Sequence, residues 1–234
     1  MIKEKLFFGF TILSIGLMII FSHNQFLINN KTLTNVSFNK IEQNFLTPML
    51  VNKLLKQKIG VNANQLNLKL DLKNIEDFLE SLPEVHNAEV FYNTDNIINV
   101  EVYETSALLR IQSEAFYLDP FGVKIPFSRN FTPQVPLYSG TFHDSIVDEL
   151  VNLSKFILVD PYLKSELVEI WNENNGYSLR LRNHNFDIFW GKVKNNEEKK
   201  EKLKAFCAYA IDNKSKIKSK KIDLTILDQV ISIN

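Results

Sequence analysis

Residues that could carry out chemistry are few in this sequence and widely spaced. The four histidines stand at positions 23, 86, 143 and 184, without the HxxxH or HxH spacing that would let two of them share a metal ion. The single cysteine, Cys207, excludes a disulfide framework, a cysteine-based zinc site and a CxxC redox pair. The seven glycines lie too far apart for a phosphate-binding loop. The sequence therefore predicts no metal site and no cofactor.

The acids and the thiol each have a structural explanation that competes with a catalytic one. Asp119 and Asp160 each precede a proline, and Asp-Pro is a turn signal. Asp144, after His143, is expected to cap a helix rather than to form a hydrolytic dyad, because no nucleophile stands at a recognisable motif. Cys207 lies among apolar residues of a predicted helix and indicates a small buried side chain. We assign no catalytic residue and expect that the protein is not an enzyme.

The charge balance disfavours nucleic acid as a partner. Lys and Arg number 27 and Asp and Glu number 27, so the formal net charge is zero, whereas nucleic-acid binders carry a basic excess. The charged run 197–204 has helical spacing, with Glu198 and Lys202 at i,i+4, and predicts a solvated helix face. No motif points to a small-molecule substrate. A second basic cluster follows this run. It has two possible interpretations, a solvent-exposed turn or a contact with anionic lipid headgroups. The cluster comprises Lys214, Lys216, Lys218, Lys220 and Lys221.

Aromatic residues gather around a predicted turn at Asn174-Asn175-Gly176. The flanking segments alternate apolar and polar residues, so we expect two strands and a sheet core. The alternative is that a minority of these aromatics is exposed and binds a protein, since aromatics dominate binding hot spots. The pattern does not choose between the two for Trp171, Tyr177, Phe186, Phe189 and Trp190.

The N-terminus predicts a membrane anchor. Leu6–Phe21 contains no charge and would rise roughly 24 Å as a helix, a little short of the ~30 Å hydrocarbon core, so we assign 6–28 to a transmembrane helix with its juxtamembrane segment. No A-x-A-like site follows, which favours an uncleaved anchor over a signal peptide. Lys3 and Lys5 precede the apolar run, so the positive-inside rule places the tail 1–5 in the cytoplasm.

Residues 33–105 carry the pattern of a small domain with the order β-α-α-β-β. A Thr-Pro pair marks a helix start, a 3.6-residue period marks a second helix, and Pro83 stops it. Leu79 on that helix and Val100 on the last strand are expected to face the interior. The expected elements are a strand at Leu33–Phe38, a helix from Thr47 to Gly60, a helix from Asp71 to Pro83, and a hairpin of Val85–Tyr92 with Ile97–Tyr103.

Two runs within this region resemble a POTRA domain. Leu79–Val90 matches its LP-x-V-x-x-A-x-V step, and Ile98–Glu104 matches its I-x-V-x-E strand. These marks alone leave two families open, the multi-POTRA outer-membrane insertases and the bacterial cell-division proteins FtsQ and DivIB.

The second half of the chain resembles the FtsQ/DivIB division family, and the order of anchor, POTRA domain and mixed β-domain covers essentially the whole chain. The match departs where the family has Arg-Tyr and a following Gly, since Thr225-Ile226 and 228–230 stand there. The matched motifs are the yLD-x-x-G turn at Phe116–Val123, the LP-x-l-x-G step at Gln134–Gly140, the i-x-l-G unit at Phe186–Gly191 with the charged helix from Asn196 to Asn213, and the iDLRy strand at Lys221–Leu224.

The resemblance implies an α+β fold: a transmembrane helix, a POTRA domain over 33–105, and an FtsQ-type mixed β-sheet domain with flanking helices over 106–234. It implies a non-catalytic single-pass scaffold of the septum machinery, in the inner membrane with its body in the periplasm, enriched at the division septum. Its partners would be division proteins, including small bitopic coiled-coil proteins of the FtsB and FtsL type. The alternatives are a POTRA-bearing secretion or outer-membrane assembly factor, disfavoured by the lack of regular strand alternation after residue 105, and an anchored hydrolase.

Two sheet edges are the candidate partner sites, because an open strand offers N–H and C=O groups that an incoming strand can satisfy. One is the first strand of the POTRA domain, near Val36, and the other is the C-terminal strand, near Asp223 to Ile233, where the family it resembles binds its coiled-coil partners. Its last residues, Gln229 to Ile233, include neither charge nor proline, the usual protections of an edge. Asp228-Gln229 are expected to form the turn before it; the alternative is a central or helix-covered strand. The residues assigned to partner binding are Val36, Ile226, Gln229, Val230, Ile231, Ser232 and Ile233.

Overall fold

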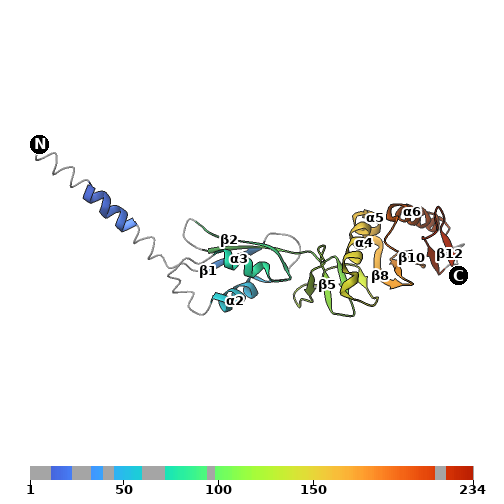
Figure 1. The fold of residues 1–234 in the computed structure, drawn as a ribbon, viewed down its shortest axis with the longest axis horizontal. Coiled ribbons are helices and arrows are strands. Elements are labelled where there is room, and N and C mark those ends of the chain that lie inside the picture. Colours follow the sequence, from blue (N-terminus) through green and yellow to red (C-terminus); the bar gives the residue numbers. More distant parts are fainter. Residues whose placement is uncertain are drawn as a thin grey trace, which may run out of the picture. The chain divides into compact units, whose positions relative to one another are not determined.

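The computed structural model describes six stretches of the chain, which are 12–22, 33–38, 45–59, 72–93, 98–213 and 220–233. They divide into two compact units (Figure 1). The first unit holds Met1–Glu42 and Leu46–Glu104, and the second holds Gln43–Phe45 and Thr105–Asn234.

The predicted anchor falls only partly on described residues. Residues 12–22 form a helix, whereas the tail 1–5 and the first part of Leu6–Phe21 lie outside the described residues. Among the described stretches, no helix combines the length and the apolar character needed to span a bilayer. The transmembrane segment therefore stays a prediction.

The first unit confirms the element order expected from periodicity. Its sheet has the order β1-β3-β2, with β1 parallel and β2 antiparallel to the central strand β3 (Figure 1). The elements are β1 (Leu33–Phe38), α2 (Pro48–Ile59), α3 (Leu72–Glu80), β2 (Val85–Tyr92) and β3 (Ile98–Glu104).

One apolar cluster holds the first unit together. Leu79 on α3 and Val100 on β3 are both 0% exposed, which confirms their expected inward orientation. The register pairs Ala88 with Val102 and Val90 with Val100, so these buried side chains share the sheet face on which the helices pack. The helix start is also confirmed, since Thr47 Oγ1 accepts a hydrogen bond from the amide of Leu50 at 3.2 Å.

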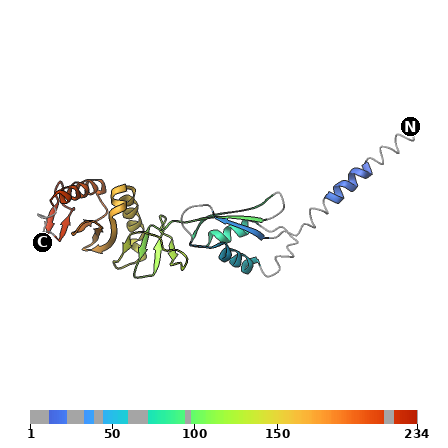
Figure 2. The same cartoon turned by 180° about the vertical axis from the view of Figure 1, so that it is seen from behind.

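The second unit is a nine-stranded mixed sheet with the order β12-β11-β10-β9-β8-β7-β4-β5-β6, flanked by helices (Figures 1 and 2). Several strands have only two or three residues. The elements are β4 (Leu109–Ile111), β5 (Phe116–Leu118), β6 (Lys124–Pro126), β7 (Leu137–Tyr138), the 3₁₀ turn η2 (Asp144–Ile146), α4 (Val147–Val159), α5 (Pro161–Glu166), β8 (Leu167–Glu173), β9 (Gly176–Leu181), β10 (Asp187–Gly191), α6 (Asn196–Asp212), β11 (Lys221–Asp223) and β12 (Ile231–Ile233).

The helices α4, α5 and α6 cover one face of this sheet (Figures 1 and 2). Ile170, Leu179 and Ile188 are paired across β8, β9 and β10, so they point to the same side, and all three belong to the buried cluster that includes Leu203 of α6. The opposite face, which we call the open face, carries the intervening residues of each strand. The aromatics split between the faces, since Trp190 is 0% exposed whereas Trp171 is half-buried on the open face.

The Asp-Pro turns have the structural roles expected of them. Asp119 is buried, and its Oδ1 accepts hydrogen bonds from the amides of Phe121 (2.7 Å) and Val123 (2.8 Å), which closes the β5–β6 hairpin. Gly122 in this turn has a φ of 84°, and a Cβ there would lie 2.9 Å from a methyl of Val147. Asp160 caps α5 by accepting from the amides of Tyr162 and Leu163.

Two expectations about charged residues are wrong. Asp144 does not cap a helix; its carboxylate pairs instead with Lys124 at 2.6 Å, a partner that a local pattern does not reveal. The charged run of α6 is not a uniformly solvated face, because Lys199 is only 6% exposed and donates to the carbonyl of Lys192 at 2.7 Å. Burial lowers the pKa of Lys199. Cys207 is buried as expected, and burial raises the pKa of its thiol to about 11.

Candidate functional site

In the part of the chain that the structure describes, four strands stand at the ends of the two sheets, and each is a possible place for an added strand. They are β1 and β2 in the first unit and β6 and β12 in the second. The residues around each edge differ in how far they leave its main-chain groups available.

The β2 edge is closed by two carboxylates. Glu76 Oε1 accepts a hydrogen bond from the amide of Val90 at 2.9 Å, and Glu80 Oε1 accepts from the amide of Ala88 at 3.3 Å. Both glutamates lie on α3, which runs alongside this strand. An incoming strand would have to displace both side chains, so β2 is a poor docking edge.

The β6 edge is protected by its composition. It has only three residues, and Pro126 provides no N–H for a ladder. Lys124 is exposed and ion-paired with Asp144. Proline and lysine on a very short strand are the usual means by which proteins prevent edge pairing.

The predicted residue Val36 lies in β1, at the outer position of the first sheet. Its backbone pairs with Val100 of the central strand β3. The structure therefore places Val36 on an edge strand, as expected of that candidate.

The C-terminal candidate lies at the other sheet end. Ile231, Ser232 and Ile233 form β12, the outermost strand of the nine, and pair with β11 in antiparallel register. Among the described strands, β12 is therefore an edge strand and not a central one. Ile231 is 41% exposed and pairs with Asp223, which puts it on the open face.

The C-terminal strand is shorter than expected, and Ile226 and Gln229, two of the residues assigned to partner binding, lie in the turn before it. Ile226 is exposed, and its carbonyl accepts from the amide of Gln229 at 3.4 Å, so these residues close the turn and are not strand residues. Val230 is half-buried and packs against the larger core. The structure thus brings Ile226 to Ile233 together at one end of the sheet, and Val36 belongs to the other unit.

The open face forms two rows of residues that end at β12. Cross-strand pairing aligns one row from β8 to β11 as Glu169, Arg180, Asp187 and Lys221, and the backbone of Lys221 pairs with that of Ile233 in β12. The parallel row runs through Trp171, Ser178, Phe189, Asp223 and Ile231.

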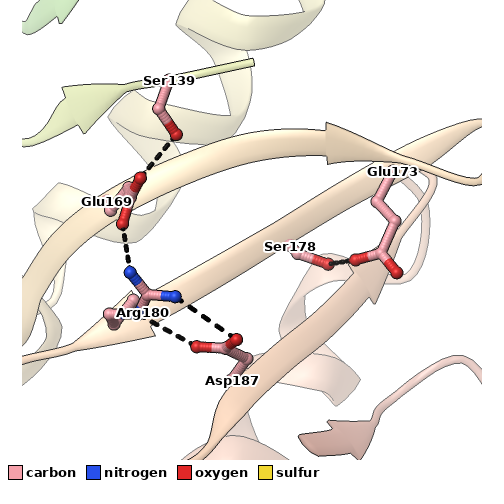
Figure 3. A network of polar contacts seen from close by, with 6 residues as sticks. All are labelled: Ser139, Glu169, Glu173, Ser178, Arg180 and Asp187. Carbon is pink, nitrogen blue, oxygen red and sulfur yellow. Dashed lines mark hydrogen bonds and ion pairs between the residues drawn. The ribbon is translucent and has the colours of Figure 1, made fainter.

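The charges in these rows neutralise one another across the strands (Figure 3). Arg180 links Glu169, at 2.6 Å, to Asp187, at 3.0 Å, and Ser139 donates to the same Glu169 at 2.5 Å. The hydrogen bond to Asp187 raises the pKa of Arg180.

A second network on this face reaches β11. Glu173 accepts from Ser178 at 2.8 Å (Figure 3) and pairs with Lys221 at 2.5 Å. The hydrogen bond from Lys221, followed by that from Ser178, holds the pKa of Glu173 below its usual value. The Glu173 carboxylate is therefore ionised and paired at neutral pH, and its contacts tie β8 to β9 and β11.

Cations also stack on the two half-buried aromatics of the open face. The guanidinium of Arg180 lies 5.1 Å from the ring of Trp171, and the ammonium of Lys221 lies 5.1 Å from the ring of Phe189. Within the described stretches, no group of three His, Cys, Asp or Glu side chains could hold a metal ion. The chemistry that this region offers is main-chain hydrogen bonding at an aligned, apolar strand end.

Two features of the edges could not be found from sequence patterns. The first is the pair of hydrogen bonds that the carboxylates of Glu76 and Glu80 accept from amides of β2. The sequence around them indicates only that both glutamates lie on an amphipathic helix. The Glu198–Lys202 pair is visible as an i,i+4 pair, but its contacts with the segment before β12 are not local.

Comparison with known protein families gives a match over the second unit. Residues 107–233, more than half of the chain, match the family model described as FtsQ/DivIB, C-terminal related. No curated protein matches the chain. The matched range contains the whole nine-stranded sheet with its helices, from β4 to β12. The chain therefore belongs to the FtsQ/DivIB family.

Proposed function

We propose that this protein is a non-catalytic, membrane-anchored scaffold of the bacterial division machinery, which binds other division proteins by adding a strand at β12. Membership of the FtsQ/DivIB family supports a role in cell division. The observation that carries the mechanism is the contrast between the edges: β2 is capped, β6 contains proline and lysine, and β12 is outermost with neither.

The first unit acts in this proposal as a POTRA domain over residues 33–105, beside the β-domain over 106–234. The support is its β-α-α-β-β order and the sheet order β1-β3-β2. Its β1 edge, with Val36, offers a second docking strand. Two separate edges would let one chain hold two partners, which is the task of a scaffold.

The N-terminal helix anchors the protein in the inner membrane, with the tail inside and the body in the periplasm. In the helix 12–22, apolar side chains on all sides are exposed, from Ile12 to Phe21. A helix that is apolar all round needs an apolar environment, which a bilayer provides. Lys3 and Lys5 support the orientation.

The proposed partners of β12 are small bitopic coiled-coil division proteins of the FtsB and FtsL type. An extended segment of such a protein would continue the sheet and cover Ile231. A POTRA-bearing secretion or outer-membrane assembly factor is disfavoured. The reason is that residues 107–233, which contain the whole nine-stranded sheet, match the division family.

We expect the protein to gather at midcell in dividing cells. The experiment is a fluorescent fusion at the N-terminus of the full chain, compared with a fusion that carries residues 1–28 alone. The full chain should form a band at the septum, whereas the anchor alone should label the whole periphery. An even peripheral signal from the full chain during constriction would refute the division role.

A further inference from the structure

One ion pair on α6 holds the turn that leads into β12. Lys202 Nζ donates hydrogen bonds to the carbonyl of Leu224 at 2.9 Å and to the carbonyl of Ile226 at 2.7 Å. It also lies 2.9 Å from Glu198 Oε1. An ammonium group has three N–H donors, so these three acceptors engage all of them. The side chain of Lys202 is largely buried by this arrangement.

Glu198 completes the contact with the turn. Its Oε1 accepts a hydrogen bond from the amide of Asp228 at 3.3 Å. Asp228 has a φ of 54°, a left-handed conformation that a residue other than glycine adopts when its surroundings hold it there. The pair therefore binds main-chain groups at the start of the turn and within it. Lys202, and then the Asp228 amide, hold the pKa of Glu198 below its usual value.

The strand that follows is short and has an exposed apolar residue. It comprises three residues, and its recorded strand neighbour is β11. Ile231 and Leu227 are exposed, so little apolar burial holds this end of the sheet. Short strands at a sheet edge open at low free energy unless another contact holds them. The α6 pair supplies such a contact directly before the strand.

We propose that Glu198 and Lys202 are positioning residues that preform the β12 edge for an incoming strand. This inference rests on the proposed function, since it concerns the presentation of the same docking edge. A strand held in place by the helix before binding loses less conformational freedom on binding than a frayed one. Affinity for the partner thus depends on a helix that need not touch the partner at all.

The test is Lys202→Met in the full chain in detergent micelles, because methionine keeps a side chain of similar length and removes the ammonium. Deuterium exchange is measured, without partner, in peptides that cover 224–234. We expect exchange to become roughly tenfold faster or more, because the turn loses the hydrogen bonds that the charged ammonium of Lys202 donates to its carbonyls. Lys202→Arg should restore part of the protection. Lys200→Met is the matched control, because Lys200 pairs with Glu197 and not with the turn.

A second measurement tests whether the Glu198–Lys202 pair also affects partner binding. We expect Lys202→Met to weaken binding of the external segment of the same bacterium's FtsB-type protein about tenfold, and Lys200→Met to leave it unchanged. Unchanged exchange in Lys202→Met would overturn the inference whatever the partner does. Faster exchange with unchanged affinity would overturn the positioning role. If the unaltered protein does not bind this segment, the proposed docking fails, and the exchange data alone still decide whether the pair holds the strand.

Discussion

Replacing Ile231 with proline is expected to weaken binding of the FtsB-type external segment roughly 100-fold. The N–H of Ile231 faces its pair Asp223 in β11, so proline removes a hydrogen bond that holds β12 in the sheet, and it restricts the backbone of the residue before it, Val230. In a strand of three residues this disrupts pairing along its length. A loss of two to three main-chain hydrogen bonds, at about 1 kcal/mol each, corresponds to a change of that size. Titration calorimetry with the chain from residue 29 onward measures it.

The matched control for this experiment is Ile231→Thr. Threonine keeps the N–H and the β-branched side chain, so binding should fall by much less than with proline. Both variants should keep the circular dichroism spectrum and melting temperature of the parent, because Ile231 is 41% exposed and the core lies on the other face. Full binding by the proline variant, or unfolding of both variants, would remove the support for docking at β12.

Replacing Leu79 with alanine is expected to lower the free energy of unfolding of the first unit by about 2–5 kcal/mol, the range for truncating a buried leucine. Leu79 is 0% exposed and lies in the cluster that joins α3 to the sheet. Both tryptophans, Trp171 and Trp190, belong to the second unit. Urea unfolding followed by circular dichroism should therefore show an earlier transition, while the tryptophan fluorescence transition stays in place.

Met49→Ala serves as the control within the same unit, since Met49 is 82% exposed. That change should alter stability by less than about 0.5 kcal/mol. A similarly small loss for Leu79→Ala would show that α3 does not pack as its periodicity indicates. A shift of the fluorescence transition in Leu79→Ala would show that the two units do not unfold separately.

Much of the fold could be predicted because its signals are local. The helix start at Thr47, the 3.6-residue period of α3 and the alternation in β3 each lie within one element, and each was confirmed. The turn at Asp119 was equally local, since a carboxylate that accepts from two nearby amides needs only its own neighbours.

The remaining features depend on contacts between distant segments. Asp144 has the sequence context of a cap, but Lys124 on β6 competes successfully for its carboxylate. Lys199 and Lys202 have the spacing of a solvated face, yet α6 meets the loop after β10 and the turn before β12, and their ammonium groups bind carbonyls there. Helical spacing specifies which side chains share a face and not what that face meets.

The β12 edge could also be predicted only in part from the sequence. The absence of charge and proline in the last strand could be read from the sequence, and the structure places that strand outermost. The extent of the strand could not be read, because Ile226 and Val230 have strand propensity but one closes a turn and the other packs against the core. The capping of β2 by Glu76 and Glu80 required the three-dimensional position of α3.

The measurement that tests strand docking most directly is deuterium exchange of the full chain with and without the FtsB-type external segment. We predict that the partner protects the peptides that contain β12, Ile231–Ile233, and leaves the capped β2 edge and the β6 edge unchanged. Protection at β2 or β6, with no change in the peptides that contain β12, would contradict docking at the C-terminal edge.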